Sequence, residues 1–273
     1  MIHEKIAVTA PDSGETGYLY TYFLESSEEM RPDERRPVIL MCPGGGYAMT
    51  SDREAEPVAV RFLAMGYHAA VLRYSVAPAR YPTALFQTAQ SVLWLKEHAA
   101  EYHIDPDRII LQGCSAGGHL AANYGVAWNR PFLAEALGAV SEQLKPAGLL
   151  LCYPVITSGE KAHRESFENL LGDRYEQLKD ELSLEYQVTE QTPPAFLWHT
   201  ATDDTVPAEN SLYFFEALLA KGVFAELHIY PVGGHGLSLA NEETCRSNGV
   251  GVQKECQSWI DLAQTWLERI VNS

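Results

Sequence analysis

The sequence lacks any long apolar run. No stretch approaches the roughly 20 consecutive apolar residues that a membrane-spanning helix requires. Residues 1–5 also lack the basic start and the following apolar segment of a secretory signal peptide. We therefore expect no membrane partner and no secretion signal.

Cysteine is scarce, and its spacing carries no metal or redox motif. The count of five is odd and no CxxC pair occurs, which predicts reduced thiols in a reducing compartment, the cytoplasm. The histidines and cysteines are scattered without HExxH or CxxC spacing, so we expect no metal ion. The cysteines stand at positions 42, 114, 152, 245 and 256.

Positive charge is also in short supply. The chain has 20 Lys and Arg against 36 Asp and Glu, which gives a formal net charge of −16. Such a field repels phosphate backbones, so a nucleic-acid partner is excluded. Apolar residues, by contrast, make up 46% of the 273 positions, which is enough for a large core.

The apolar residues predict a single α/β domain over residues 1–273. Short apolar runs alternate with amphipathic stretches, which is typical of βαβ units, a mostly parallel eight-stranded sheet and helices on both faces. The first two strands, separated by a turn at 11–14, predict an antiparallel hairpin. Strands are expected at 5–9, 18–24, 38–42, 67–74, 109–112, 149–153, 195–200 and 226–230. Helices are expected at 54–65, 83–98, 115–128, 207–220 and 252–271.

Residues 157–192 interrupt this alternation. The segment is long, polar and partly helical, without a clear sheet strand. In an open α/β sheet, ligands bind at the carboxyl ends of the strands. We expect the segment to be a small cap over that edge, with a surface excursion as the alternative.

A nucleophile motif follows the strand at 109–112. Residues 113–117 read Gly-Cys-Ser-Ala-Gly, with Ser115 at the centre. Small residues two before and two after the serine allow the sharp strand-to-helix turn that exposes its hydroxyl. The motif alone arises by chance, but the strand before it and the helix after it predict a catalytic serine.

A base and an orienting acid follow in the order that this motif requires. His235 lies among glycines in a loop after the last strand, and its imidazole can accept the Ser115 proton near neutral pH. After the strand at 195–200, both Asp203 and Asp204 could orient the imidazole. Asp203 is favoured because it stands three residues before Val206, whereas Asp204 is placed to cap the next helix. The order Ser115, Asp203, His235 is the α/β-hydrolase order.

The oxyanion hole needs backbone N–H groups. Ala116, directly after the serine, is expected to supply one of them. Gly44 and Gly45, in the Gly44–Gly46 run after the strand at 38–42, are expected to supply the other, with the choice among the three glycines left open. This run lacks a following Gly-Lys-Ser/Thr, and neither glycine cluster has the G-x-G-x-x-G spacing, so no nucleotide cofactor is expected.

Taken together, these motifs resemble the bacterial acetyl esterase, or acetylxylan-esterase-like, branch of the α/β-hydrolases. The matching segments are 42–47, 113–120, 198–204 and 233–236, with 53–59 as a further likeness. The resemblance implies Ser115 as nucleophile, His235 as base, Asp203 as orienting acid, and Gly44, Gly45 and Ala116 as oxyanion donors. The chain departs from it at Pro43, which fills the histidine position of His-Gly-Gly-Gly, and at Cys114, where bulky apolar residues are common.

The resemblance implies a serine esterase that removes short acyl groups such as acetyl, often from sugars or xylo-oligosaccharides. The bulky Tyr47 and Trp198 are expected to line the substrate pocket and to favour acetyl over octanoyl esters. Two alternatives remain open: another acyl hydrolase of this fold, such as a peptidase or arylformamidase, and a non-catalytic small-molecule binder. The sequence leaves the oligomeric state open, with a homo-oligomer among the alternatives.

Overall fold

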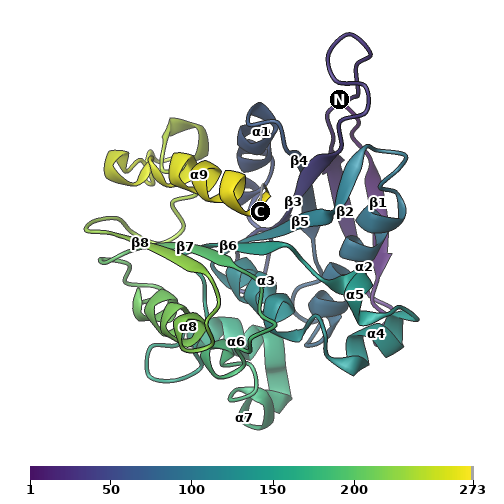
Figure 1. Ribbon diagram of the computed structural model, residues 1–273. Helices are drawn as coiled ribbons and strands as arrows, with labels where there is room; N and C mark the ends of the chain where they lie inside the picture. The colour runs from purple at the N-terminus through teal and green to yellow at the C-terminus, as the bar shows by residue number, and fades with distance from the viewer. Residues whose placement is uncertain (272–273) are drawn as a thin grey trace.

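The computed structural model describes residues 1–271 and has an eight-stranded sheet. The sheet is twisted and lies at the centre of the structure (Figure 1). The strand order is β1-β2-β4-β3-β5-β6-β7-β8. β2 pairs antiparallel with β1 and β4, and every other pairing is parallel, which confirms the predicted fold class. The strands are β1 (Lys5–Thr9), β2 (Thr16–Tyr22), β3 (Arg36–Cys42), β4 (His68–Arg73), β5 (Ile104–Cys114), β6 (Gly148–Cys152), β7 (Ala195–Thr200) and β8 (Ala225–Tyr230).

Helices cover both faces of the sheet (Figure 1). α1 (Glu56–Ala64) and α9 (Trp259–Val271) pack on one face, where Ile39 and Met41 of β3 point. α2 (Thr83–Glu97), α3 (Ala116–Ala127) and α8 (Glu209–Ala220) pack on the other, with Val38 and Leu40. Alternate residues of a strand face opposite sides, so each central strand is apolar throughout and contributes to both cores.

Two short helices between α3 and β6 are not among the predicted elements. They are α4 (Pro131–Leu137), which ends at Gly138 in a left-handed conformation with φ 62°, and α5 (Ser141–Leu144). Both are too short to show a helical apolar period. The last helix begins at Trp259 rather than at 252, because a 3₁₀ turn, η5 (Lys254–Cys256), occupies the chain before it.

The segment 157–192 contains no strand and lies between β6 and β7. It forms α6 (Arg164–Leu171), η2 (Gly172–Arg174), α7 (Tyr175–Leu178) and η3 (Leu184–Tyr186). The amide of Asn169 in α6 donates to the carbonyl of Gly46 at 2.9 Å, and the carbonyl of Leu182 lies 2.9 Å from Nε2 of His119. The segment therefore contacts both the glycine run after β3 and the helix after the elbow.

No helix within residues 1–271 combines the length and the apolar character needed to cross a bilayer.

Candidate active site

The elbow at Ser115 is a strained turn that only small neighbours permit. Ser115 has φ 54° and ψ −120° between β5 and α3, a conformation that L-residues rarely adopt. A Cβ atom on Gly113 would lie 2.2 Å from the carbonyl oxygen of Gly117, and one on Gly117 would lie 2.0 Å from that of Cys42. The two glycines are required by close backbone approach, and the turn holds the serine at the carboxyl end of β5.

His235 lies beside this serine although 120 positions separate them. Its Nε2 is 2.7 Å from the Ser115 Oγ. The histidine lies in the loop after β8, between Gly233 with φ 141° and Gly236 with φ 72°. Both glycines have positive φ, so the backbone conformation that presents the imidazole suits glycine and is strained for other residues.

Asp203 completes a chain of hydrogen bonds. Its Oδ2 is 2.7 Å from Nδ1 of His235, so Nδ1 carries the hydrogen and Nε2 is left to accept the Ser115 proton. Its Oδ1 accepts the N–H groups of Thr205 at 3.0 Å and Val206 at 2.9 Å. Burial opposes ionisation, but hydrogen bonds from His199, His235 and the Val206 N–H outweigh it and hold the pKa of Asp203 well below its usual range.

The alternative acid, Asp204, points elsewhere. It is exposed, and within residues 1–271 its Oδ1 accepts only the Thr205 hydroxyl, at 3.4 Å. It does not cap α8 either, because that helix has Ala208 at its N-cap and no side-chain cap hydrogen bond. Of the two aspartates, only Asp203 is in a position to orient His235.

His199 is a neighbour that the sequence pattern does not identify as a partner of Asp203. Fully buried at the end of β7, it has its Nε2 2.8 Å from the Val206 carbonyl and 3.3 Å from Oδ2 of Asp203. Since both are acceptors, Nε2 carries the hydrogen and Nδ1 accepts from the Ser211 hydroxyl at 2.8 Å. His199 thus helps to hold the ionised Asp203 in place.

Glu54 is a second residue beside the catalytic groups that the sequence does not identify. Nothing in the sequence distinguishes it from Glu56, which is exposed. Glu54 is 4% exposed, and one oxygen accepts the N–H of Gly44 at 2.8 Å while the other accepts the hydroxyl of Tyr153 at 2.8 Å. Tyr153 packs edge-on against the His235 ring, with 5.2 Å between centroids. Through these contacts one buried carboxylate joins the glycine run to the packing around the imidazole.

This contact corrects part of the predicted oxyanion hole. The N–H of Gly44 already donates to Glu54, so it is not available to an oxyanion. Among residues 1–271, the N–H groups of Gly45 and Gly46 have no hydrogen-bond acceptor. Ala116 is the first residue of α3, where the helix itself provides no acceptor for the N–H. The free donors around Ser115 are therefore those of Gly45, Gly46 and Ala116.

A cavity of about 310 Å³ opens above Ser115 and His235. Neither Tyr47 nor Trp198 lines it, so the predicted pocket residues are wrong. Tyr47 is 2% exposed and its hydroxyl bonds Nδ1 of His119 at 2.9 Å, while Trp198 is fully buried and stacks on Trp259 under α9. The lining residues are Gly45, Gly46, Met49, Ser51, Arg53, Glu54, Ser115, His163, Thr205, His235, Gly236 and Arg246.

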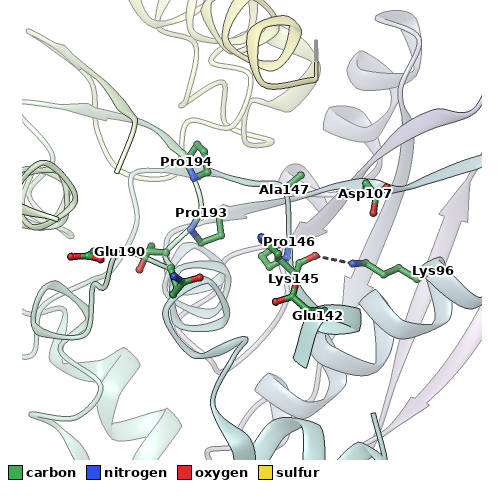
Figure 2. A pocket seen from close by; sticks show the side chains of 11 residues that line it. Lys96, Asp107, Glu142, Lys145, Pro146, Ala147, Glu190, Pro193 and Pro194 are labelled. Atoms are coloured by element: carbon green, nitrogen blue, oxygen red, sulfur yellow. Dashed lines mark hydrogen bonds between the residues drawn. The ribbon is translucent and has the colours of Figure 1, made fainter. Parts of the chain in front are cut away.

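A larger hollow of about 460 Å³ lies at the opposite edge of the sheet, before β6 and β7 (Figure 2). Figure 2 shows Lys96 reaching the carbonyl of Lys145, to which its Nζ donates at 3.0 Å, with Pro146 beside Lys145 and Pro193 and Pro194 across the hollow. The residues that line this larger hollow include lysines and carboxylates but no serine, cysteine or histidine. The chemistry of acyl transfer is therefore available only at the smaller cavity of the two.

Known proteins are similar to this chain over most of its length. The BD-FAE family model matches residues 27–218. The chain is 35% identical to "Endo-1,4-beta-xylanase B" of Butyrivibrio fibrisolvens over 77% of its own length and 34% of that protein. It spans 53% and 55% of the next two curated relatives, which are esterases of Mycobacterium tuberculosis.

Two solved structures resemble the whole chain. One is an acetyl ester-xyloside bifunctional hydrolase from Caldicellulosiruptor lactoaceticus, with a TM-score of 0.83 and 34% identity over 98% of this chain and 96% of that one. The other is the carboxylesterase Cest-2923 from Lactobacillus plantarum WCFS1, with a TM-score of 0.86 and 31% identity over 98% of both chains. The predicted resemblance to acetylxylan-esterase-like hydrolases is confirmed, and the chain belongs to the BD-FAE family of the α/β-hydrolase superfamily.

Proposed function

We propose that the protein is a serine carboxylic-ester hydrolase that removes short acyl groups, in particular acetyl, from acetylated sugars or xylo-oligosaccharides. The observation that carries the proposal is the hydrogen-bonded chain from Ser115 through His235 to Asp203, with both links at 2.7 Å. The names of the xylan-related relatives support the sugar as the alcohol part of the ester.

The reaction has two steps through an acyl-enzyme. Oγ of Ser115 attacks the acyl carbon while Nε2 of His235 takes its proton, and the alcohol then leaves with that proton. In the second step water attacks the acyl carbon and gives a proton to Nε2 of His235. His235 then returns that proton to Oγ of Ser115 as the bond between Oγ and the acyl carbon breaks, and the acid leaves. Asp203 stays ionised throughout, as its lowered pKa requires, and stabilises the imidazolium.

The negative oxygen of each tetrahedral intermediate needs donors beside Ser115. The N–H groups of Gly45, Gly46 and Ala116 are free for this role. We assign them as the oxyanion hole because preorganised backbone donors stabilise developing charge without reorganisation. Segment 157–192 serves as a small cap in this account, since it contacts the glycine run and places His163 in the cavity wall.

The proposed partner is a small-molecule ester, with no nucleic acid, membrane or cofactor involved. All five cysteines are free thiols, which supports a cytoplasmic location. The proposal includes a homo-oligomer as one form of the protein, and the mass in solution tests it.

Acetate release from acetylated xylo-oligosaccharides, alongside 4-nitrophenyl esters of rising chain length, tests this function. We expect hydrolysis of the acetylated sugar and a higher kcat/KM for the acetyl than for the octanoyl ester, because the cavity holds only about 310 Å³. A formanilide and a peptide substrate complete the panel. A preference for octanoyl esters, or for either of these two substrates, would overturn the short-acyl assignment.

The substitution Glu54→Gln is expected to lower kcat about 10- to 100-fold, which corresponds to one hydrogen bond to a charged group. An amide cannot accept from both Gly44 and Tyr153, so the glycine run loses one of its supports. KM should change little, since neither contact involves the substrate. Glu56→Gln, at an exposed carboxylate two positions away, is the matched control. Equal kcat values in the two variants would show that Glu54 does not support the glycine run during catalysis.

A further inference from the structure

Two arginines line the cavity above Ser115 without a carboxylate partner. Arg53 precedes Glu54 in η1 (Asp52–Glu54), and Arg246 lies in the exposed loop before η5. Within residues 1–271, no carboxylate oxygen lies within 4.0 Å of either guanidinium. This is unusual in a chain of net charge −16, where acidic side chains outnumber basic ones by 36 to 20.

The structure fixes Arg53 in this place. Its Nε donates to the carbonyl of Thr244 at 2.5 Å, and its own carbonyl accepts the hydroxyl of Ser238 at 2.6 Å. Its Nη2 is buried without an acceptor among the described residues. The loop that carries Arg246 packs against it, since a Cβ atom on Gly251 would lie 3.0 Å from Nη2. The two cations thus belong to adjoining segments at one side of the cavity.

Besides the two arginines the cavity wall carries one carboxylate, so its cations outnumber its anions by two to one. Glu54 is the one carboxylate among the lining residues, and both its oxygens already accept hydrogen bonds from Gly44 and Tyr153. Burial lowers the pKa of His163, which leaves its ring neutral near pH 7. His235 is engaged with Asp203 and Ser115.

We propose that the alcohol part of the ester carries a carboxylate, which Arg53 and Arg246 bind while Ser115 attacks the acyl group. An acylated sugar acid has this chemistry. An acetyl group carries no charge, so the carboxylate has to lie on the alcohol part of the ester. This inference therefore rests on the proposed function, the removal of acetyl groups. The planar guanidinium matches a carboxylate with paired, charge-assisted hydrogen bonds. The net negative field of the protein repels anions, so local cations are needed to hold such a substrate.

The test compares two acetate esters of equal size, (4-acetoxyphenyl)acetate and its uncharged amide. The methylene group separates the charge from the phenol, so the leaving groups are closely matched. We expect the carboxylate ester to have the higher kcat/KM by about tenfold to a hundredfold, through a lower KM. In Arg53→Gln and Arg246→Gln the ratio should fall toward one, and in Arg61→Gln, an exposed arginine on α1, it should stay as in the parent protein. The ratio within one protein does not depend on the fraction that is folded.

Equal kcat/KM for the two esters in the parent protein would overturn this inference and leave the proposed function standing. A preference for the carboxylate that persists in both arginine variants would overturn the assignment to these residues. If phenyl hemisuccinate were preferred over phenyl acetate while the matched pair reacted equally, the carboxylate would belong to the acyl side and the placement would be wrong. No turnover of any acetyl ester would overturn the proposed function itself.

Discussion

Replacing Ser115 with alanine is expected to lower kcat for an activated acetate ester by about 10⁶-fold, the loss typical of a serine that acts together with a histidine base. The variant keeps the free N–H groups of Gly45, Gly46 and Ala116, so a slow residual rate above that in water should remain. Steady-state hydrolysis of 4-nitrophenyl acetate measures the effect.

The exposed Ser258 provides the control, because among the described residues its hydroxyl forms a hydrogen bond only with the Tyr230 hydroxyl. Ser258→Ala should retain the parent rate. Circular dichroism of both variants checks that they fold. A folded Ser115→Ala protein with the parent rate would show that another group attacks the ester.

Replacing Asp203 with asparagine is expected to lower kcat by about 10⁴-fold. The asparagine amide can donate to Nδ1 of His235, which favours the tautomer with the hydrogen on Nε2 and removes the base from Ser115. Loss of the negative charge also leaves the imidazolium unsupported in a buried setting. The measurement is kcat for 4-nitrophenyl acetate across a range of pH.

Asp204→Asn is the matched control, since it makes the same chemical change one residue away on an exposed carboxylate. It should keep kcat within about twofold, as surface substitutions away from a site usually have small effects. If the two variants lost activity equally, or if Asp204→Asn lost more, the assignment of Asp203 would have to be abandoned.

The position of the three proposed catalytic residues could be predicted because each follows a strand. β5, β7 and β8 lie in one parallel part of the sheet, so the loops after them open at the same edge. Ser115, Asp203 and His235 stand in those loops, and the glycines around the serine and histidine mark the sharp turns in the sequence itself. The glycine-rich turns and the order of the strands together are enough to predict where these three residues lie.

The direction of the bulky side chains could not be predicted. Trp198 lies in β7, a strand buried on both faces, so the sequence shows no alternation that would tell which face the indole takes. It points under α9, away from the cavity. Tyr47 directly follows the Gly44–Gly46 run and has φ 57°, and its ring lies in the core against His119.

The supports around the site were also beyond the sequence pattern. Glu54 and His199 act through contacts with residues far along the chain or on another element, and neither has a motif of its own. Where Pro43 replaces the histidine expected from the resemblance, its carbonyl accepts the hydroxyl of Tyr74 at 2.7 Å. Together with the Glu54 bond to Gly44, this contact holds the glycine run in place.

The formation of an acyl-enzyme on Ser115 is tested by acid quenching of the parent protein during turnover of 4-nitrophenyl acetate, followed by peptide mass spectrometry. The acyl-enzyme is an ester on the nucleophile, and acid quenching traps it as one added acetyl group. We expect this acetyl group on the peptide that contains Ser115 in the parent protein and expect it to be absent from Ser115→Ala. An acetyl group on a different residue during productive turnover, with Ser115 unmodified, would contradict this expectation.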